Sequence, residues 1–203
     1  MLASINPLGE RSRNRSWGAT FTWYVAGSVA GGVAMGAAFG LLGAGIDALL
    51  PRHDTLTAVL VLGCALLALA YDLHLFGLRL PTIVRQVDEN WLPRYRAWVY
   101  AGGFGLQLGL GVVTVVTTSA VYLTWIFAVL AGSVWGGIVI GATFGLVRAL
   151  PMLLVARADT PGLLRARLRA FAAAAPLATR VTTVVVFSLP VVALTALMLG
   201  GGA

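Results

Sequence analysis

The chain has 203 residues, of which 59% are hydrophobic and only 10% are charged, and its mean hydropathy is +0.91. A soluble domain needs more charge than this to cover its surface, so most of the surface must face lipid. The net charge of +7 comes from arginines placed between apolar stretches, a distribution that argues against a nucleic-acid partner. The composition predicts an all-α integral membrane helical bundle whose partner is the lipid bilayer.

In chain order, the apolar stretches predict five transmembrane helices, because about 20 apolar residues cross a bilayer. They are expected at about 16–42, 55–75, 97–117, 121–147 and 180–199. Arginines precede the first stretch, as in a signal peptide, but its apolar run exceeds the length of a signal sequence, which indicates a retained helix. We expect one transmembrane domain over 1–203, with repeat-like halves at 16–118 and 121–203.

Two charged connections predict cytoplasmic amphipathic helices that lie along the membrane surface. One covers residues 80–95. The other follows Thr160, which is expected to be its N-cap. Its arginines are expected to reach lipid headgroups: Arg165, Arg167 and Arg169.

The arginines also predict the orientation. If the N-terminus is cytoplasmic, every arginine except Arg52 falls on the cytoplasmic side. Positive residues are enriched on that side of membrane proteins. We therefore expect a multi-pass protein of the cell inner (plasma) membrane, with its C-terminus outside.

The most informative feature is an internal repeat. Residues 27–42 (GSVAGGVAMGAAFGLL) and 132–147 (GSVWGGIVIGATFGLV) match at ten of sixteen positions, at an offset of 105. Because the two predicted helices run in opposite directions, the copies would form a degenerate inverted repeat. Inverted repeats are common in secondary transporters. The second half, however, lacks one helix of the first.

Glycines recur at every fourth residue in both copies: Gly32, Gly36 and Gly40, then Gly137, Gly141 and Gly145. Two interpretations are open. Such faces let helix backbones pack closely in lipid, or they flex to admit a substrate. Ser28 and Ser133 lie one turn away, and their hydroxyls would bond back to carbonyls of their own helices or line a polar site.

Three further residues carry candidate chemistry inside the predicted helices. Asp72 suits an interfacial ion pair, for example with Arg79, or a proton or cation role. Gln107 suits an interhelical hydrogen bond or a polar solute, and Cys64 suits helix packing or a thiol function. Because no nucleophile–base pair or metal-ligand cluster is apparent, we expect no enzyme activity, no cofactor and no metal.

The end of the fourth predicted helix, from Gly141 to Pro151 (GATFGLVRALP), resembles glycine-rich helix ends in CcdA/DsbD-type membrane proteins. The resemblance implies inverted three-helix halves that pass reducing equivalents across the bilayer. That chemistry uses a pair of intramembrane cysteines, whereas this chain has only Cys64. The resemblance therefore implies a related scaffold without the dithiol activity.

Two functions follow as hypotheses. The first is a transporter-like inverted-repeat scaffold that handles a small solute or serves a transport or redox system. The second is a non-catalytic membrane anchor or structural subunit of a larger membrane complex. The incomplete second half suggests a homodimer or a partner membrane subunit.

Overall fold

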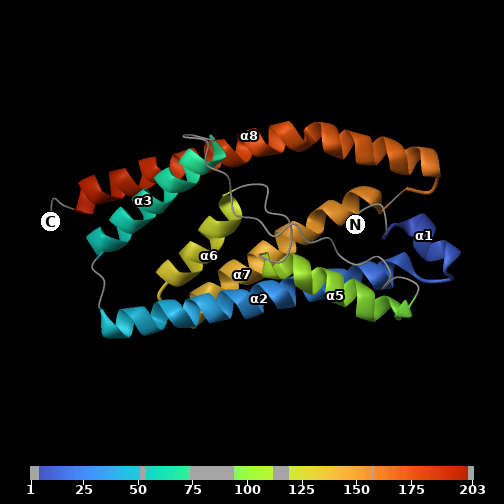
Figure 1. The fold of residues 1–203 in the computed structure, drawn as a ribbon, viewed down its shortest axis with the longest axis horizontal. Helices are drawn as coiled ribbons and strands as arrows, with labels where there is room; N and C mark the ends of the chain where they lie inside the picture. The colour runs from blue at the N-terminus through green and yellow to red at the C-terminus, as the bar shows by residue number, and fades with distance from the viewer. Residues whose placement is uncertain (1–4, 51–53, 74–93, 112–118, 157, 201–203) are drawn as a thin grey trace.

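The computed structural model describes residues 5–50, 54–73, 94–111, 119–156 and 158–200, and within these ranges it is helical with no strand (Figure 1). The helices are α1 (Pro7–Ser12), α2 (Trp17–Leu49), α3 (Asp54–Asp72), α5 (Ala97–Leu110), α6 (Ala120–Leu130), α7 (Val134–Ala149), the 3₁₀ helix η2 (Leu150–Val155) and α8 (Pro161–Gly200). In the described residues, three helical stretches are long and apolar enough to cross a membrane: Trp17–Leu49, Thr55–Asp72 and Val134–Val155. The protein is thus a membrane-spanning helical bundle.

The centre of the bundle is the contact between α2 and α7. A Cβ atom added to Gly32 would collide with the carbonyl of Gly141, and one added to Gly36 would collide with the carbonyl of Gly137. The two helices are therefore antiparallel and touch through their backbones. In lipid, where the hydrophobic effect does not drive helices together, such close packing supplies the attraction.

The α2–α7 contacts come in reciprocal pairs. In the repeat, Gly32 is equivalent to Gly137 and Gly36 is equivalent to Gly141. The Gly32–Gly141 contact and the Gly36–Gly137 contact are therefore equivalent to each other. The outer contacts behave in the same way: a Cβ on Gly145 would collide with the carbonyl of Ser28, and one on Gly40 would meet the carbonyl of Ser133. All six glycines of the two repeat faces lie in this interface.

On another side of α2, α5 packs just as closely but in parallel. A Cβ on Gly27 would collide with the carbonyl of Gly102, and one on Gly31 would meet that of Leu106. α5 ends at Leu110, where Gly111 adopts a φ of +75°. The helix is thus shorter than the predicted 97–117, and residues 112–118 lie outside the described part of the chain.

The prediction of one continuous helix over 121–147 is wrong, because the chain turns back between α6 and α7. Gly132 has a φ of +61°, a backbone conformation that glycine adopts without strain. Ser133 then caps α7 by accepting a hydrogen bond from the Gly136 amide at 3.1 Å. The equivalent Gly27 lies inside the continuous α2, so the two repeat copies differ in structure at this point.

α8 lies away from α2 and runs beside α3 (Figure 1). Here the predicted amphipathic helix and the predicted last transmembrane helix form one continuous helix of 40 residues. The Thr160 hydroxyl accepts a hydrogen bond from the Leu163 amide at 3.2 Å, which confirms Thr160 as the N-cap. Most of the other predicted amphipathic helix, 80–95, lies outside the described residues.

At the end of the bundle that carries α1, aromatic and aliphatic side chains form the main apolar core. Its buried members include Ile5, Tyr24, Tyr100, Phe104, Met152 and Val155. This cluster joins the segment before α1 to α2, α5 and η2. We call this end the α1 end.

Gly36→Ala is expected to destabilise the protein by about 1–3 kcal/mol or more, because its Cβ has no room against the Gly137 carbonyl. Gly45→Ala on the same helix is the matched control, since a Cβ there meets nothing within 4 Å. Thermal unfolding in detergent measures both. Equal midpoints for the two variants would contradict backbone contact between α2 and α7.

Candidate functional site

Ser28 lies where α2, α5 and α7 meet. It is fully buried, and its hydroxyl donates a hydrogen bond to the carbonyl of Gly145 on α7 at 2.7 Å. Its own carbonyl faces both Gly109 of α5 and Gly145. The hydroxyl thus bonds a carbonyl of the neighbouring helix α7 rather than one of its own helix, and this bond strengthens the contact among the three helices.

The other predicted polar residues lie elsewhere. Ser133 is the exposed N-cap of α7. Its contact on α2 is Gly40, twelve residues from Ser28 and so about 18 Å along the helix. Gln107 is half-buried two residues before Gly109, and therefore does not share the face of α5 that meets Ser28. The structure does not gather these three residues into one site.

Asp72 connects the end of α3 to the start of α6. Its carboxylate accepts hydrogen bonds from the Ser119 amide at 2.8 Å and from the Ser119 hydroxyl at 2.7 Å. A carboxylate at a helix N-terminus is stabilised by the unpaired amides and the helix dipole there. Arg79, the ion-pair partner suggested by the sequence, lies outside the described residues.

Cys64 lies on the α3 face that packs on α6. It is half-buried and borders a cavity of about 210 Å³, together with Leu67, Tyr71, Tyr122 and Ile126. The chain contains no other cysteine, so this thiol has no intrachain partner for a disulfide. Its immediate surroundings are mostly apolar.

Of the three arginines expected at the lipid headgroups, Arg165 and Arg169 are exposed on α8. Arg167 instead donates a hydrogen bond to the carbonyl of Leu154 in η2 at 2.9 Å. The first turns of α8 are therefore tied to η2 through Arg167, and contact of the other two arginines with lipid headgroups stays a prediction.

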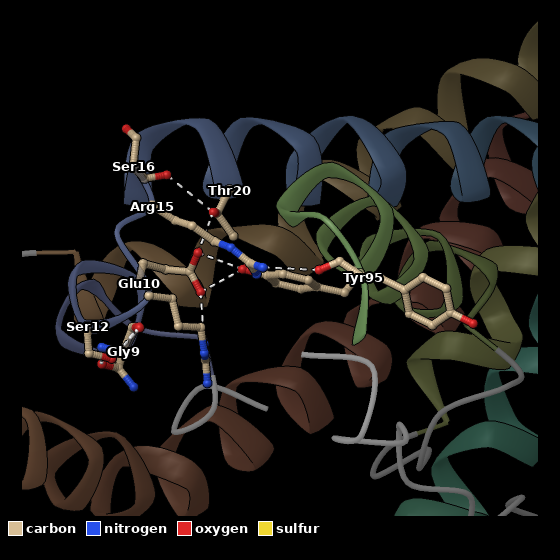
Figure 2. Close-up of polar contacts among 10 residues, drawn as sticks. Gly9, Glu10, Ser12, Arg15, Ser16, Thr20 and Tyr95 are labelled. Carbon is tan, nitrogen blue, oxygen red and sulfur yellow. Dashed lines mark hydrogen bonds and ion pairs between the residues drawn. The ribbon is translucent and has the colours of Figure 1, made fainter. Parts of the chain in front are cut away.

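A polar cluster that the sequence did not predict surrounds Glu10 at the α1 end (Figure 2). The Glu10 carboxylate is fully buried. It accepts hydrogen bonds from Thr20 at 2.8 Å and from the Tyr100 hydroxyl at 2.6 and 2.7 Å, and it forms an ion pair with Arg13 at 3.1 Å. A buried charge needs such partners to offset its lost hydration.

Arg15 completes the cluster. Its guanidinium donates to the carbonyl of Tyr95 at 3.3 Å and lies 5.4 Å from the centre of the Tyr100 ring (Figure 2). The cluster thus links α1, α2 and α5. One sequence signal pointed to it: Glu10 is the only acidic residue before Asp47, and it lies among arginines.

A second feature couples the repeat copies to α6. The ring of Trp125 on α6 lies 5.7 Å from Phe39 and 4.8 Å from Phe144, measured between ring centres. Phe39 and Phe144 are equivalent positions of the repeat. Trp125, which is buried, therefore packs between matching side chains of α2 and α7.

The contacts described above join helices to one another. Among the described residues, no group of three His, Cys, Asp or Glu side chains could hold a metal ion. The buried carboxylate and the buried serine hydroxyl are both fully engaged in contacts between helices. The fold and its polar contacts define a polytopic membrane protein held together by close backbone packing.

Comparison with known proteins gives the family. Residues 2–197 match the family described as cytochrome c biogenesis protein transmembrane region, and the chain belongs to this family. The resemblance to CcdA/DsbD-type membrane proteins is thus confirmed. No solved structure matches the chain.

Curated relatives carry a more particular name. The chain is 35% identical over 156 residues to methylamine utilization protein MauF of Methylophilus methylotrophus, covering 74% of this chain and 53% of that protein. It is 38% identical over 139 residues to MauF of Paracoccus denitrificans, covering 67% and 48%. The chain spans about half the length of the curated relatives it matches.

Tyr100→Phe is expected to loosen α1, because it removes a donor from a buried carboxylate, a loss of about 1–3 kcal/mol. The measurement is the rate of trypsin cleavage after the arginines of residues 11–15. Asp159→Asn is the control, since it breaks only the exposed ion pair with Arg11. If both variants were cleaved at the wild-type rate, the cluster would not hold α1.

Proposed function

We propose that this chain is a non-catalytic membrane component of a redox-protein biogenesis system, in which it acts as a scaffold without dithiol chemistry. The family description and the methylamine utilization relatives support a place in such a system. The single cysteine, Cys64, supports the absence of dithiol chemistry, because thiol–disulfide exchange within one chain needs two thiols.

The observation that carries the proposal is the backbone contact at the centre of the bundle. α2 touches both α5 and α7 with no side chain between them, and the Ser28 hydroxyl bonds Gly145. A solute path between the repeat copies would require these backbones to separate and would leave Ser28 without its partner. A scaffold requires neither change.

We further infer that α2 and α7 are the two copies of an inverted repeat. The reciprocal pairing of their glycines and the packing of Phe39 and Phe144 on Trp125 support this inference. The same reciprocity favours the alternative function, a small-solute carrier, because inverted repeats are common in carriers.

We also propose that five crossings are made by α2, α3, a discontinuous α5–α6 pair, α7 and α8. α5 is parallel to α2. α6 is also parallel to α2, because Phe39 lies beside Trp125 and Gly43 faces the Val129 carbonyl, so the two short helices point the same way. Their lengths of 14 and 11 residues together match one crossing. The arginine bias supports the inner membrane, a cytoplasmic N-terminus and an external C-terminus.

Purification in a mild detergent is expected to recover a second protein in stoichiometric amount, since a scaffold works by holding a partner. Cys64→Ser is expected to recover the same amount of partner, because the thiol is not part of the proposed role. Quantitative mass spectrometry of the purified complex measures both. Isolation of a homodimer alone, with solute uptake in vesicles, would replace this proposal by the carrier.

The orientation has its own test. A protease-sensitive tag at the C-terminus is expected to be cleaved on intact spheroplasts, whereas the same tag at the N-terminus is expected to be cleaved only after lysis. Two protected tags would contradict an odd number of crossings and with it the five-crossing layout.

A further inference from the structure

A cavity of about 640 Å³ opens between α6, α7 and α8. Its apolar lining includes Val121, Val139 and Phe144. Along α7 the lining extends from Val139 to Arg148, which is about 13 Å of helix. The lining is thus long enough for part of an acyl chain, and it is mostly apolar.

The polar groups of this cavity are not distributed evenly. Thr124, Thr143 and Thr182 border it, but each donates its hydroxyl hydrogen to a carbonyl of its own helix, at 2.8, 2.8 and 2.9 Å. Their hydroxyl hydrogens are therefore already used and are not available to a ligand. Arg148 is the charged residue in the lining, and it lies at one end.

The structure fixes the position of Arg148. Its guanidinium lies 5.3 Å from the centre of the Phe144 ring on the preceding turn of α7. It is also on the last turn of α7, where the helix dipole favours a positive charge. A guanidinium presents paired donors that match two oxygens of a phosphate.

We propose that this cavity binds one anionic phospholipid, with an acyl chain between α6 and α7 and the phosphate on Arg148. The cavity and the lipid are complementary. The cavity is mostly apolar with a cation at one end, and the lipid has an apolar acyl chain with an anionic phosphate at one end. An anionic lipid is favoured over a zwitterionic one, whose ammonium group would lie near the guanidinium. This inference does not depend on the proposed biogenesis role.

The test counts lipids retained by the purified full chain. Detergent-purified protein is incubated with phosphatidylglycerol, with phosphatidylcholine or with inorganic phosphate, and bound molecules are counted by native mass spectrometry. The wild type is expected to retain one phosphatidylglycerol and neither of the others. Arg148→Gln is expected to weaken this retention about tenfold, because it removes the charge-assisted contact.

Arg11→Gln is the charge-matched control, because Arg11 is on the surface and its side chain is 68% exposed. It is expected to retain phosphatidylglycerol as the wild type does. If Arg148→Gln bound as the wild type does, or if both variants lost binding equally, the site would be overturned in favour of lipid contact spread over the surface. Retention of phosphate alone would likewise overturn the lipid assignment.

A second pair of variants decides the question even if Arg148→Gln does not fold. Thr143→Trp fills the cavity and leaves Arg148 in place, so it is expected to reduce phosphatidylglycerol retention. Leu146→Trp adds the same ring to a half-exposed α7 position outside the cavity lining, and is expected to retain the lipid. If the two variants retained equal amounts of phosphatidylglycerol, the acyl chain of the lipid would not lie in the cavity.

Discussion

The close approach of the α2 backbone to α5 and α7 is the constraint on which the rest of the structure depends. Glycines on three helices bring carbonyls into direct contact with neighbouring backbones, and Ser28 adds one hydrogen bond at the point where the helices meet. Around this core, α6 folds back beside α7 and the Trp125 ring lies between Phe39 and Phe144. Asp72 at the end of α3 accepts a hydrogen bond from Ser119 at the start of α6.

Much of this core was predictable from the sequence, because glycine spacing on a helix directly reports a face that admits another backbone. The break between α6 and α7 was not, since Gly132 and Ser133 lie in an apolar stretch whose hydropathy is the same whether the helix continues or turns. In the first repeat copy the same Gly-Ser pair is helical, so only the surrounding structure decides between the two conformations. Hydropathy likewise could not show that α8 is one helix.

The polar contacts were likewise only partly predictable from the sequence. Asp72 and Ser28 were identifiable as polar groups in apolar helices, but their partners, Ser119 and Gly145, are distant in sequence and nothing in the pattern pairs them. The burial of Glu10 was not predicted, because this residue lies in a short charged segment that is typical of an exposed surface. Its burial arises only when α1 folds against α2 and α5. The family was recognisable from the glycine-rich end of α7, whereas the partners of these polar groups were not.

The glycine face of α2 also bears on how the protein is assembled during synthesis. α2 is synthesised before α7, and α3, α5 and α6 are made between them. During that interval α7 is not yet present to cover the glycine face of α2. This face must then be shielded by lipid or by the insertion machinery. Insertion of the individual helices and closure of the bundle are therefore separate events in time. The bundle can close only after α7 has been inserted.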